Sequence, residues 1–169
     1  GSLLSRKYVT KYGTELDALI LSGTASFIKG LGNIGLVTAT TVTTFRGRAR
    51  PNGLLKSFFF GEFNKKFRPN RTKLDWISSD EKQVDLFAED PYRIEDFSLG
   101  VFLDVIKNSK KLNKPEAFAA TPKDLPILIF SGDKDPVGEM GKGVARVAQQ
   151  YEKRGINDLT FNLYEGGRH

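Results

Sequence analysis

The sequence predicts an α/β protein built around a parallel sheet, and two patterns lead to that prediction. Short apolar segments that suit buried strands alternate with longer segments of helical periodicity, which is the order of strand–helix–strand units. Charged residues follow directly after predicted strands, and open parallel sheets bind their ligands at these carboxyl ends. The length of 169 residues suits one domain, because domains cluster at about 100–150 residues.

The first predicted elements are a helix and a strand. Leu4, Tyr8 and Tyr12 recur at helical spacing within residues 3–12, and we expect Gly13 to end this helix in the left-handed conformation. Residues 16–23 are mostly apolar and end at a glycine, which predicts a short strand. A continuous apolar strand is typical of a sheet that is covered on both faces.

From Thr24 to about Asp90 the alternation is interrupted by a stretch rich in glycine, threonine and phenylalanine. Phe59, Phe63 and Phe67 recur every four residues and would form one stripe on a helix. We interpret this region as an insertion of short helices and loops. Residues 30–35 match Gly-x-Gly-x-x-Gly, but no strand directly precedes them and no acid lies at residues 52–56, so we favour loop and helix packing over nucleotide binding.

Regular alternation returns at Ile94. We predict a helix over 94–107, a buried strand over 125–131, a helix within 136–154 that stops at Gly155, and a last strand over 159–164. The apolar face of the first helix would carry Phe97, Val101, Val105 and Ile106, and that of the second Met140, Val144, Val147, Ala148 and Tyr151.

The composition excludes several classes of protein. With no cysteine, there is no disulfide framework or thiolate chemistry, and a single histidine argues against a histidine-based metal site. No apolar run approaches the roughly 20 residues of a transmembrane helix, and no secretory signal opens the chain. We therefore expect a cytoplasmic protein with no metal and no cofactor.

The net charge of +6 is concentrated in one segment, since residues 46–73 hold nine basic residues and one acid, Glu62. Together with the phenylalanines of residues 54–68, this segment could line an acyl pocket or contact an anionic membrane surface. A solvated basic face above a cap helix that packs on the core is the plainer interpretation. Nucleic acid is not expected as a partner, because the rest of the chain has no basic track.

The strongest functional pattern joins two strand ends. Asp135 follows the strand 125–131, and His169 follows the strand 159–164, which is the order of the acid and the base in a Ser…Asp…His triad. Such an acid accepts the Nδ1 proton of the histidine and fixes its tautomer. Asp133 competes for the acid role, but it sits beside Gly132 in the turn and more readily stabilises the loop, so Asp135 is our choice. No Gly-x-Ser-x-Gly occurs in the chain.

The whole chain resembles the monoglyceride lipase, lysophospholipase and serine aminopeptidase group of α/β-hydrolases. The specific strings are Ser131-Gly132-Asp133-Lys134-Asp135-Pro136-Val137-Gly138 and Tyr164-Glu165-Gly166-Gly167-Arg168-His169. The resemblance implies an α/β fold that is the C-terminal part of an α/β-hydrolase, a parallel sheet flanked by helices with an inserted helical cap. The core would comprise 1–24 and 97–169, and the cap would comprise 25–96.

By the same resemblance, Asp135 is the triad acid and His169 the general base, while a Gly-His-Ser-Met-Gly elbow would place the nucleophile two residues before Gly1. Phe59, Phe63 and Val137 are candidate substrate contacts. The expected function is hydrolysis of a carboxylic ester, a monoacylglycerol or lysolipid, by a serine outside this chain. The alternative is a non-catalytic hydrolase-like module that binds lipid or protein through its basic, aromatic cap.

Overall fold

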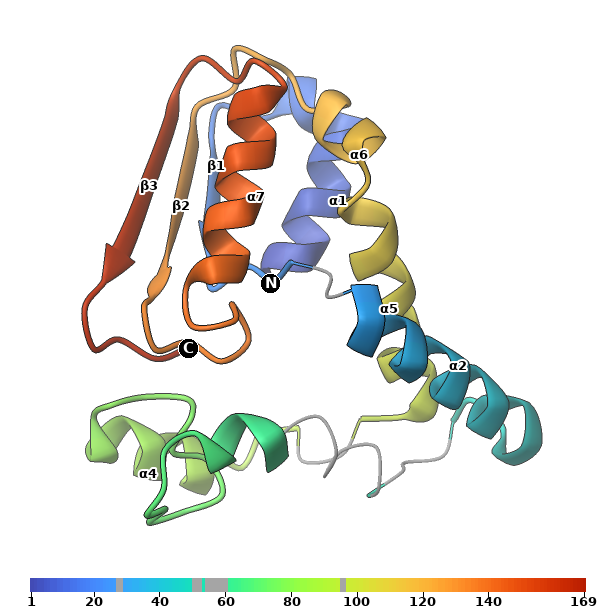
Figure 1. Cartoon of the computed structure of the whole chain (residues 1–169), viewed down its shortest axis with the longest axis vertical. Helices are drawn as coiled ribbons and strands as arrows, with labels where there is room; N and C mark the ends of the chain where they lie inside the picture. The colour runs from blue at the N-terminus through green and yellow to red at the C-terminus, as the bar shows by residue number, and fades with distance from the viewer. Residues whose placement is uncertain (27–28, 50–52, 54–60, 95–96) are drawn as a thin grey trace. The chain divides into compact units, whose positions relative to one another are not determined.

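The computed structural model describes residues 1–26, 29–49, 53, 61–94 and 97–169. Their contacts divide the chain into two units, one of residues 1–27, 108–167 and 169, the other of residues 28–107 and 168. The elements, labelled in Figure 1 except for η1, are α1 (Ser2–Tyr12), the 3₁₀ helix η1 (Gly13–Glu15), β1 (Leu19–Ser22), α2 (Lys29–Arg46), α4 (Glu81–Glu89), α5 (Leu99–Leu112), α6 (Pro115–Ala119), β2 (Ile127–Gly132), α7 (Lys142–Lys153) and β3 (Leu159–Tyr164).

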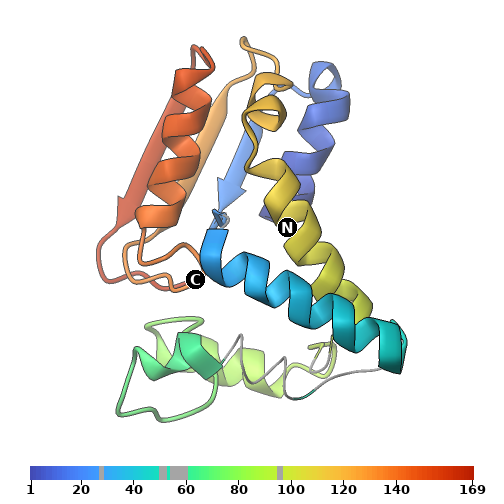
Figure 2. The ribbon, with the colours of Figure 1, turned by 45° about the vertical axis from the view of Figure 1, so that its right-hand side comes forward.

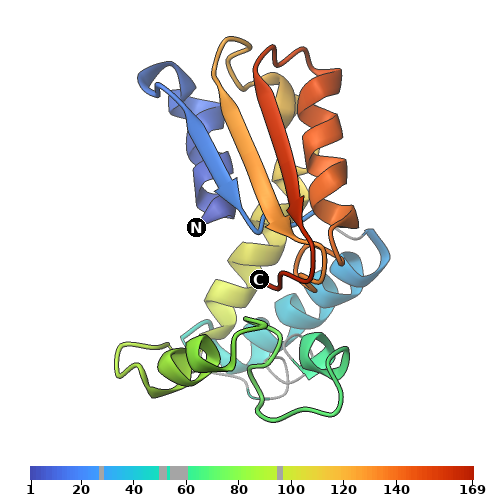
Figure 3. The same cartoon turned by 90° about the vertical axis from the view of Figure 1, so that its left-hand side faces the viewer.

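The first unit is built on a parallel sheet in the order β1-β2-β3, as the sequence predicts. Ile129 lies opposite Leu21 of β1 and Phe161 of β3. Figure 3 shows the three strands in front of α1 and α7, so both helices cover the same face of the sheet. The core between them comprises Val9, Leu19, Leu21, Phe118, Leu125, Ile127, Ile129, Val144, Val147, Ala148, Tyr151 and Ile156.

The opposite face of this sheet is not covered to the same extent. Ile20 is 63% exposed, whereas its neighbours Leu19 and Leu21 are buried. Leu128 and Phe130 on β2 are only half-buried. The expectation of a sheet covered on both faces is therefore wrong for the described residues. Apolar character predicts that a strand can be buried, but it cannot show whether the described chain supplies the covering element.

Helix α1 has the predicted extent, but its apolar stripe does not face the core. Leu4 is 72% exposed, and the residues that α1 buries are Arg6 and Val9. Gly13 is also not left-handed, because its φ is −61° and the chain continues into η1. A Cβ at Gly13 would lie 2.4 Å from Cδ of Pro122, so close packing explains this glycine better than a left-handed stop does.

The predictions for the C-terminal elements are largely confirmed. Strand β3 has the predicted bounds, and α7 buries Val144, Val147, Ala148 and Tyr151. Gly155 has a φ of +80°, the left-handed stop that a helix C-terminus favours. Met140 is an exception, because it precedes α7 in a turn with a φ of +55°.

Two helices differ from the expected pattern. In α5, Val101 and Val105 are exposed, while Phe102 and Leu103 are buried with Ile106. The buried face of this helix is therefore rotated by part of a turn from the predicted apolar face. Helix α2 continues over 18 residues and includes the Gly-x-Gly-x-x-Gly string, where we expected short helices and loops. The hydroxyls of Thr40, Thr41, Thr43 and Thr44 donate to backbone carbonyls four residues earlier, so these side chains find their hydrogen-bond partners within the helix.

The second unit contains a loop that is fixed by buried polar side chains. Asn64 donates from Nδ2 to the carbonyl of Thr72 at 2.8 Å and accepts the Trp76 N–H at 3.1 Å. The Asp75 carboxylate accepts the backbone N–H groups of Arg71 and Thr72. The two units divide the chain near residues 27 and 107, whereas the sequence suggested 24 and 96. The assignment of residues 25–96 to a cap stays a prediction.

Candidate functional site

The site is built at the carboxyl ends of the strands of the first unit. Figure 2 shows β1 and β3 pointing to the same end of the sheet, where the C-terminus also lies, and β2 runs parallel to both. Asp135 lies in the turn after β2 and is fully buried. A backbone bond from Met140 N to the Asp135 carbonyl at 2.7 Å closes this turn. The residue is therefore fixed at the strand end that parallel sheets use for function.

Hydrogen bonds bring the chain after β3 to the turn after β2. Asp133 N donates to the Tyr164 carbonyl at 3.0 Å, and Lys134 N donates to the Gly167 carbonyl at 2.9 Å. The Asp133 carboxylate accepts Gly166 N–H at 2.8 Å, which is the loop-stabilising role that we expected for this acid. These bonds hold the last residues of the chain close to Asp135.

Nδ1 of His169 lies 2.9 Å from Oδ2 of Asp135. The Asp135 side chain is wholly buried, whereas that of His169 is 36% exposed. A carboxylate at Nδ1 favours the tautomer that carries its proton there, which makes Nε2 the basic nitrogen of the ring. The structure thus brings together the two residues for which the sequence predicts catalytic roles, in a geometry that suits an acid–base pair.

The Asp135 carboxylate has two further donors. Ser131 donates from Oγ to Oδ2 at 3.0 Å, and Val137 donates its N–H to Oδ1 at 2.8 Å. Burial on its own raises the pKa of Asp135. The hydrogen bond and charge of His169, with the hydrogen bonds from Ser131 and Val137, lower this pKa by more than burial raises it, so the net shift is downward. Asp135 therefore remains a carboxylate under ordinary conditions.

Gly23 is a site residue that the sequence reasoning missed. It follows β1 with a φ of +55°, and a Cβ on it would lie 2.9 Å from Cε1 and 3.0 Å from Nδ1 of His169. The same Cβ would lie 3.3 Å from Oδ2 of Asp135. A glycine at the carboxyl end of the neighbouring strand was the available signal, since three strand ends meet at this edge.

The remaining candidate residues lie in different places. Val137 is half-buried and contacts Asp135 through its backbone N–H. Phe63 belongs to the second unit, where its ring centroid lies 5.4 Å from that of Trp76. Phe59 lies outside the described residues. The roles of these three residues as substrate contacts stay predictions.

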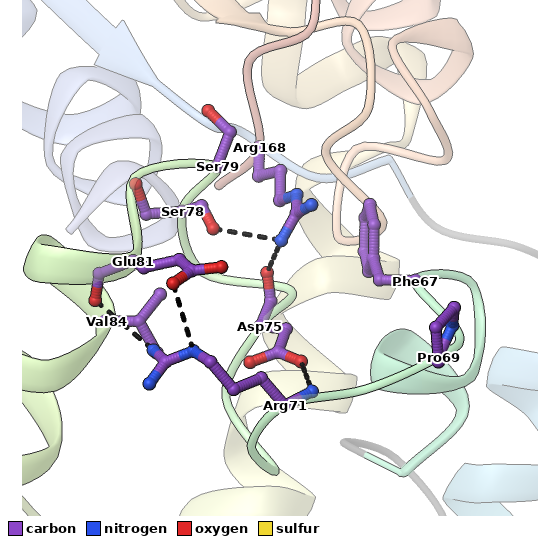
Figure 4. A pocket seen from close by; sticks show the side chains of 9 residues that line it. All are labelled: Phe67, Pro69, Arg71, Asp75, Ser78, Ser79, Glu81, Val84 and Arg168. Atoms are coloured by element: carbon purple, nitrogen blue, oxygen red, sulfur yellow. Dashed lines mark hydrogen bonds and ion pairs between the residues drawn. The ribbon is translucent and has the colours of Figure 1, made fainter.

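Arg168, the residue before His169, belongs to the second unit by its contacts. Its Nη1 donates to the carbonyls of Asp75 and Ser78, and its guanidinium lies 4.3 Å from the centroid of the Phe67 ring. Figure 4 shows Arg168 among the residues that line a cavity of about 120 Å³. Charged and polar side chains dominate this lining, so the cavity does not suit an acyl chain.

The basic segment of residues 46–73 is partly neutralised by acids from elsewhere in the chain. Arg71 lies 2.7 Å from Asp85 and 3.7 Å from Glu81, and Arg48 lies 2.7 Å from Asp104. Lys65 pairs with Glu62 inside the segment. These pairs favour the plainer interpretation of the segment as a solvated charged face.

Two other kinds of site are absent from the part of the chain that the structure describes. There, no group of three or more acidic or histidine side chains is arranged to hold a metal ion. Among the same residues, no helix combines the length and hydropathy that crossing a membrane requires.

Comparisons with known proteins place this geometry in a family. The sequence profile described as serine aminopeptidase, family S33, matches residues 1–169. No curated protein sequence matches the chain. A thermostable carboxyl esterase from Bacillus coagulans, solved with glycerol, matches 100% of this chain with a TM-score of 0.91 and 25% identity. A lipase in its open form matches 100% of the chain with a TM-score of 0.84 and 25% identity.

A soluble variant of the monoglyceride lipase from Saccharomyces cerevisiae, in complex with a substrate analog, shares the fold at 19% identity and a TM-score of 0.69 over 100% of this chain. The chain spans about half the length of these solved proteins, 55% of the esterase and of the open-form lipase and 54% of the yeast enzyme. Because the profile matches the whole chain and the fold agrees with it, the chain forms part of an α/β-hydrolase fold and belongs to the serine aminopeptidase family S33.

Proposed function

We propose that this chain supplies the acid and the base of a serine hydrolase that cleaves carboxylic esters. The observation that carries the proposal is the bond of 2.9 Å between Nδ1 of His169 and the buried carboxylate of Asp135. The fold shared with a carboxyl esterase and a lipase, each at 25% identity, supports ester chemistry. The nucleophilic serine would come from a part of the protein that these 169 residues do not include, because they contain no Gly-x-Ser-x-Gly.

In the proposed mechanism, Nε2 of His169 takes the proton of the serine hydroxyl as its oxygen attacks the acyl carbonyl. The imidazolium then gives this proton to the leaving alcohol, and an acyl-enzyme remains. Water attacks the acyl-enzyme by the same route, and the acid product and free serine are formed. Asp135 stays ionised throughout and stabilises the imidazolium, which agrees with the lowered pKa of its carboxyl.

We propose monoacylglycerols or lysolipids as the substrates. Support comes from the shared fold of the yeast monoglyceride lipase and from the phenylalanine-rich segment that contains Phe59 and Phe63. Contact with an anionic membrane surface is part of this proposal, although the pairing of Arg48 and Arg71 with acids reduces the charge available for it. A cytoplasmic location, with no metal and no cofactor, completes the proposal.

The experiment uses a polypeptide that joins this chain to its upstream segment, assayed with nitrophenyl esters, monoacylglycerol, lysophospholipid and an aminoacyl nitroanilide. We expect ester cleavage in the wild type, and a loss in kcat of about 10⁶-fold for His169→Ala, the order of loss found when the histidine of another serine-hydrolase triad is removed. Glu165→Ala is the matched control, because Glu165 is an exposed residue of the same loop. Equal rates for His169→Ala and wild type would refute the triad role. Cleavage of the nitroanilide but of no ester would show that the protein is a peptidase and would refute the proposed esterase activity.

A non-catalytic module that binds lipid or protein is the second candidate, and one observation favours it: the 169 residues hold no nucleophile elbow. Its test is the upstream sequence and the same assay. An upstream segment without a Gly-x-Ser-x-Gly, together with no turnover of any ester, would establish this candidate over the hydrolase.

A further inference from the structure

A buried serine lies beside the proposed acid–base pair and has no part in the mechanism above. Ser131 is the fifth residue of β2, it is 4% exposed, and its Oγ lies 3.0 Å from Oδ2 of Asp135. A buried hydroxyl needs a hydrogen-bond partner, and any nearby carbonyl would satisfy that need. Here the partner is the same carboxylate oxygen that contacts His169.

The bond from Ser131 restricts the rotation of the Asp135 carboxylate. The terminal torsion of an aspartate is broad and roughly two-fold, so packing on its own defines it poorly. Val137 N–H holds Oδ1 at 2.8 Å, and the Ser131 hydroxyl holds Oδ2. Both oxygens are thus fixed by groups other than His169, one from the strand and one from the turn that follows it.

We propose that Ser131 is a positioning residue, whose hydroxyl orients the Asp135 carboxylate so that Oδ2 meets Nδ1 of His169. Its catalytic consequence rests on the proposed function. Ser131 is buried against Asp135 and would act only through that carboxylate. Gly138 packs beside this arrangement: a Cβ on it would clash with Cγ2 of Val144 at 2.6 Å but would make only ordinary contact, at 3.6 Å, with Oδ2 of Asp135 and Oγ of Ser131.

The first arm of the test measures the carboxylate directly and needs no activity. The chain holds one histidine, so the Cε1–H resonance of His169 is a single reporter of its neighbour. In this 169-residue chain, the acid-side inflection of that resonance reports protonation of Asp135 together with that of the terminal carboxylate of His169 itself, and only the Asp135 part depends on residue 131. For Ser131→Ala we expect the inflection to move upward by about one pH unit, which is the size expected when a hydrogen bond to a charged group is lost.

Three variants separate orientation from simple packing. Ser131→Thr keeps the hydroxyl and should restore the wild-type inflection. Ser131→Cys keeps the size but is a weak donor, so it should behave like Ser131→Ala. Ser22→Ala removes an exposed serine at the end of the neighbouring strand and should change nothing. Thermal unfolding of each variant at neutral pH verifies that it is folded.

The second arm measures ester hydrolysis in the polypeptide that includes the upstream serine. We expect Ser131→Ala to lower kcat about tenfold with little change in KM, and Ser131→Thr to recover most of that loss. The proposal is overturned if Ser131→Ala keeps the wild-type acid inflection, or if Ser131→Thr is as impaired as Ser131→Ala in both arms. A wild type that hydrolyses no ester would overturn the proposed function alone, since the resonance arm still decides the role of Ser131.

Discussion

Asp135 is fully buried, yet it is held in its ionised form by donors from three parts of the chain. His169 and Ser131 share Oδ2, and Val137 N–H binds Oδ1. Burial without these partners would favour the neutral acid, and a neutral acid could not stabilise an imidazolium. The chemistry of the site at the residue scale therefore depends on satisfying every oxygen of one carboxylate.

Gly23 gives the sharpest test of the packing around His169. For Gly23→Ala we expect a loss in ester hydrolysis of about 10–100-fold, because the new Cβ lies 2.9 Å from the imidazole and must displace it. The positive φ adds a cost of about 1–2 kcal/mol in the free energy of unfolding. Nitrophenyl ester kinetics and urea unfolding measure the two effects in the polypeptide that includes the upstream serine.

Gly47→Ala is the matched control for this prediction. Gly47 has a φ of +80°, and a Cβ on it would meet nothing within 4 Å. It should show the same order of destabilisation with no change in kcat. If both variants lose activity equally, backbone strain and not contact with His169 is responsible.

The proximity of Asp135 and His169 could be predicted from the sequence because the ends of neighbouring parallel strands converge, whatever the details of packing. Gly23 and Ser131 could not be singled out in that way. The roles that we infer for them depend on distances of about 3 Å, from Gly23 to His169 and from Ser131 to Asp135, and such distances are a property of the folded structure. A serine or glycine at a strand end has many ordinary explanations.

The helices show a corresponding difference between pattern and packing. Periodicity predicts that α1 and α5 are helical, but it does not show which face the described chain covers. Leu4 on α1 is exposed, while Arg6 on the same helix is 1% exposed. A buried arginine is unusual, and no sequence pattern indicated it, because an arginine normally keeps its charge in water.

Arg6 links α1 to several other elements of the first unit. Its Nη2 donates to the Leu112 carbonyl at the end of α5 at 2.7 Å, and its Nη1 donates to the Ala25 carbonyl at 2.9 Å. The guanidinium carbon lies 5.1 Å from the centroid of the Phe118 ring. Burial lowers the pKa of Arg6, and the charge interaction and side-chain hydrogen bond with Tyr151 oppose this shift. The carbonyl at a helix C-terminus also carries partial negative charge that suits a cation.

For Arg6→Ala we expect the free energy of unfolding to fall by about 3–5 kcal/mol, because the buried carbonyl of Leu112 and the part-buried carbonyl of Ala25 lose their donor and the removed side chain leaves a cavity. Urea unfolding followed by circular dichroism measures this change. Lys7→Ala is the control, since Lys7 is exposed and substitutions at such positions stay within about 0.5 kcal/mol. An Arg6→Ala variant as stable as Lys7→Ala would show that these bonds contribute nothing net.

At the scale of the whole molecule, a charge pattern in the sequence has to be weighed against pairing across long separations. The segment 46–73 is strongly basic when taken alone, but Arg48 is paired with Asp104 and Arg71 with Asp85. These acids lie outside the segment, so a window along the sequence overestimates its surface charge. The exposed pairs add little stability, but they reduce the field that an anionic surface would meet.

One face of the sheet carries exposed apolar side chains, and the solved proteins that share the fold are longer than this chain. Ile20, Leu128 and Phe130 lie on this face, and the solved esterase and lipase are nearly twice as long as this chain, which spans 55% of each. We propose that the remainder of a longer protein covers this face, since exposed apolar faces of this kind are typical of interfaces.

Ile20→Ser tests that proposal by its context dependence. In the 169-residue chain Ile20 is already 63% exposed, so the variant should change the free energy of unfolding by no more than about 0.5 kcal/mol. In the polypeptide that includes the upstream segment, the same change should cost about 2–4 kcal/mol, because the side chain would then be buried. Leu163→Ser, on the edge strand β3 and 42% exposed, is the control and should have a small effect in both. Urea unfolding of the two variants, each in both polypeptides, gives the comparison. A small effect of Ile20→Ser in the longer polypeptide would contradict the proposal, because it would mean that this face of the sheet stays exposed there.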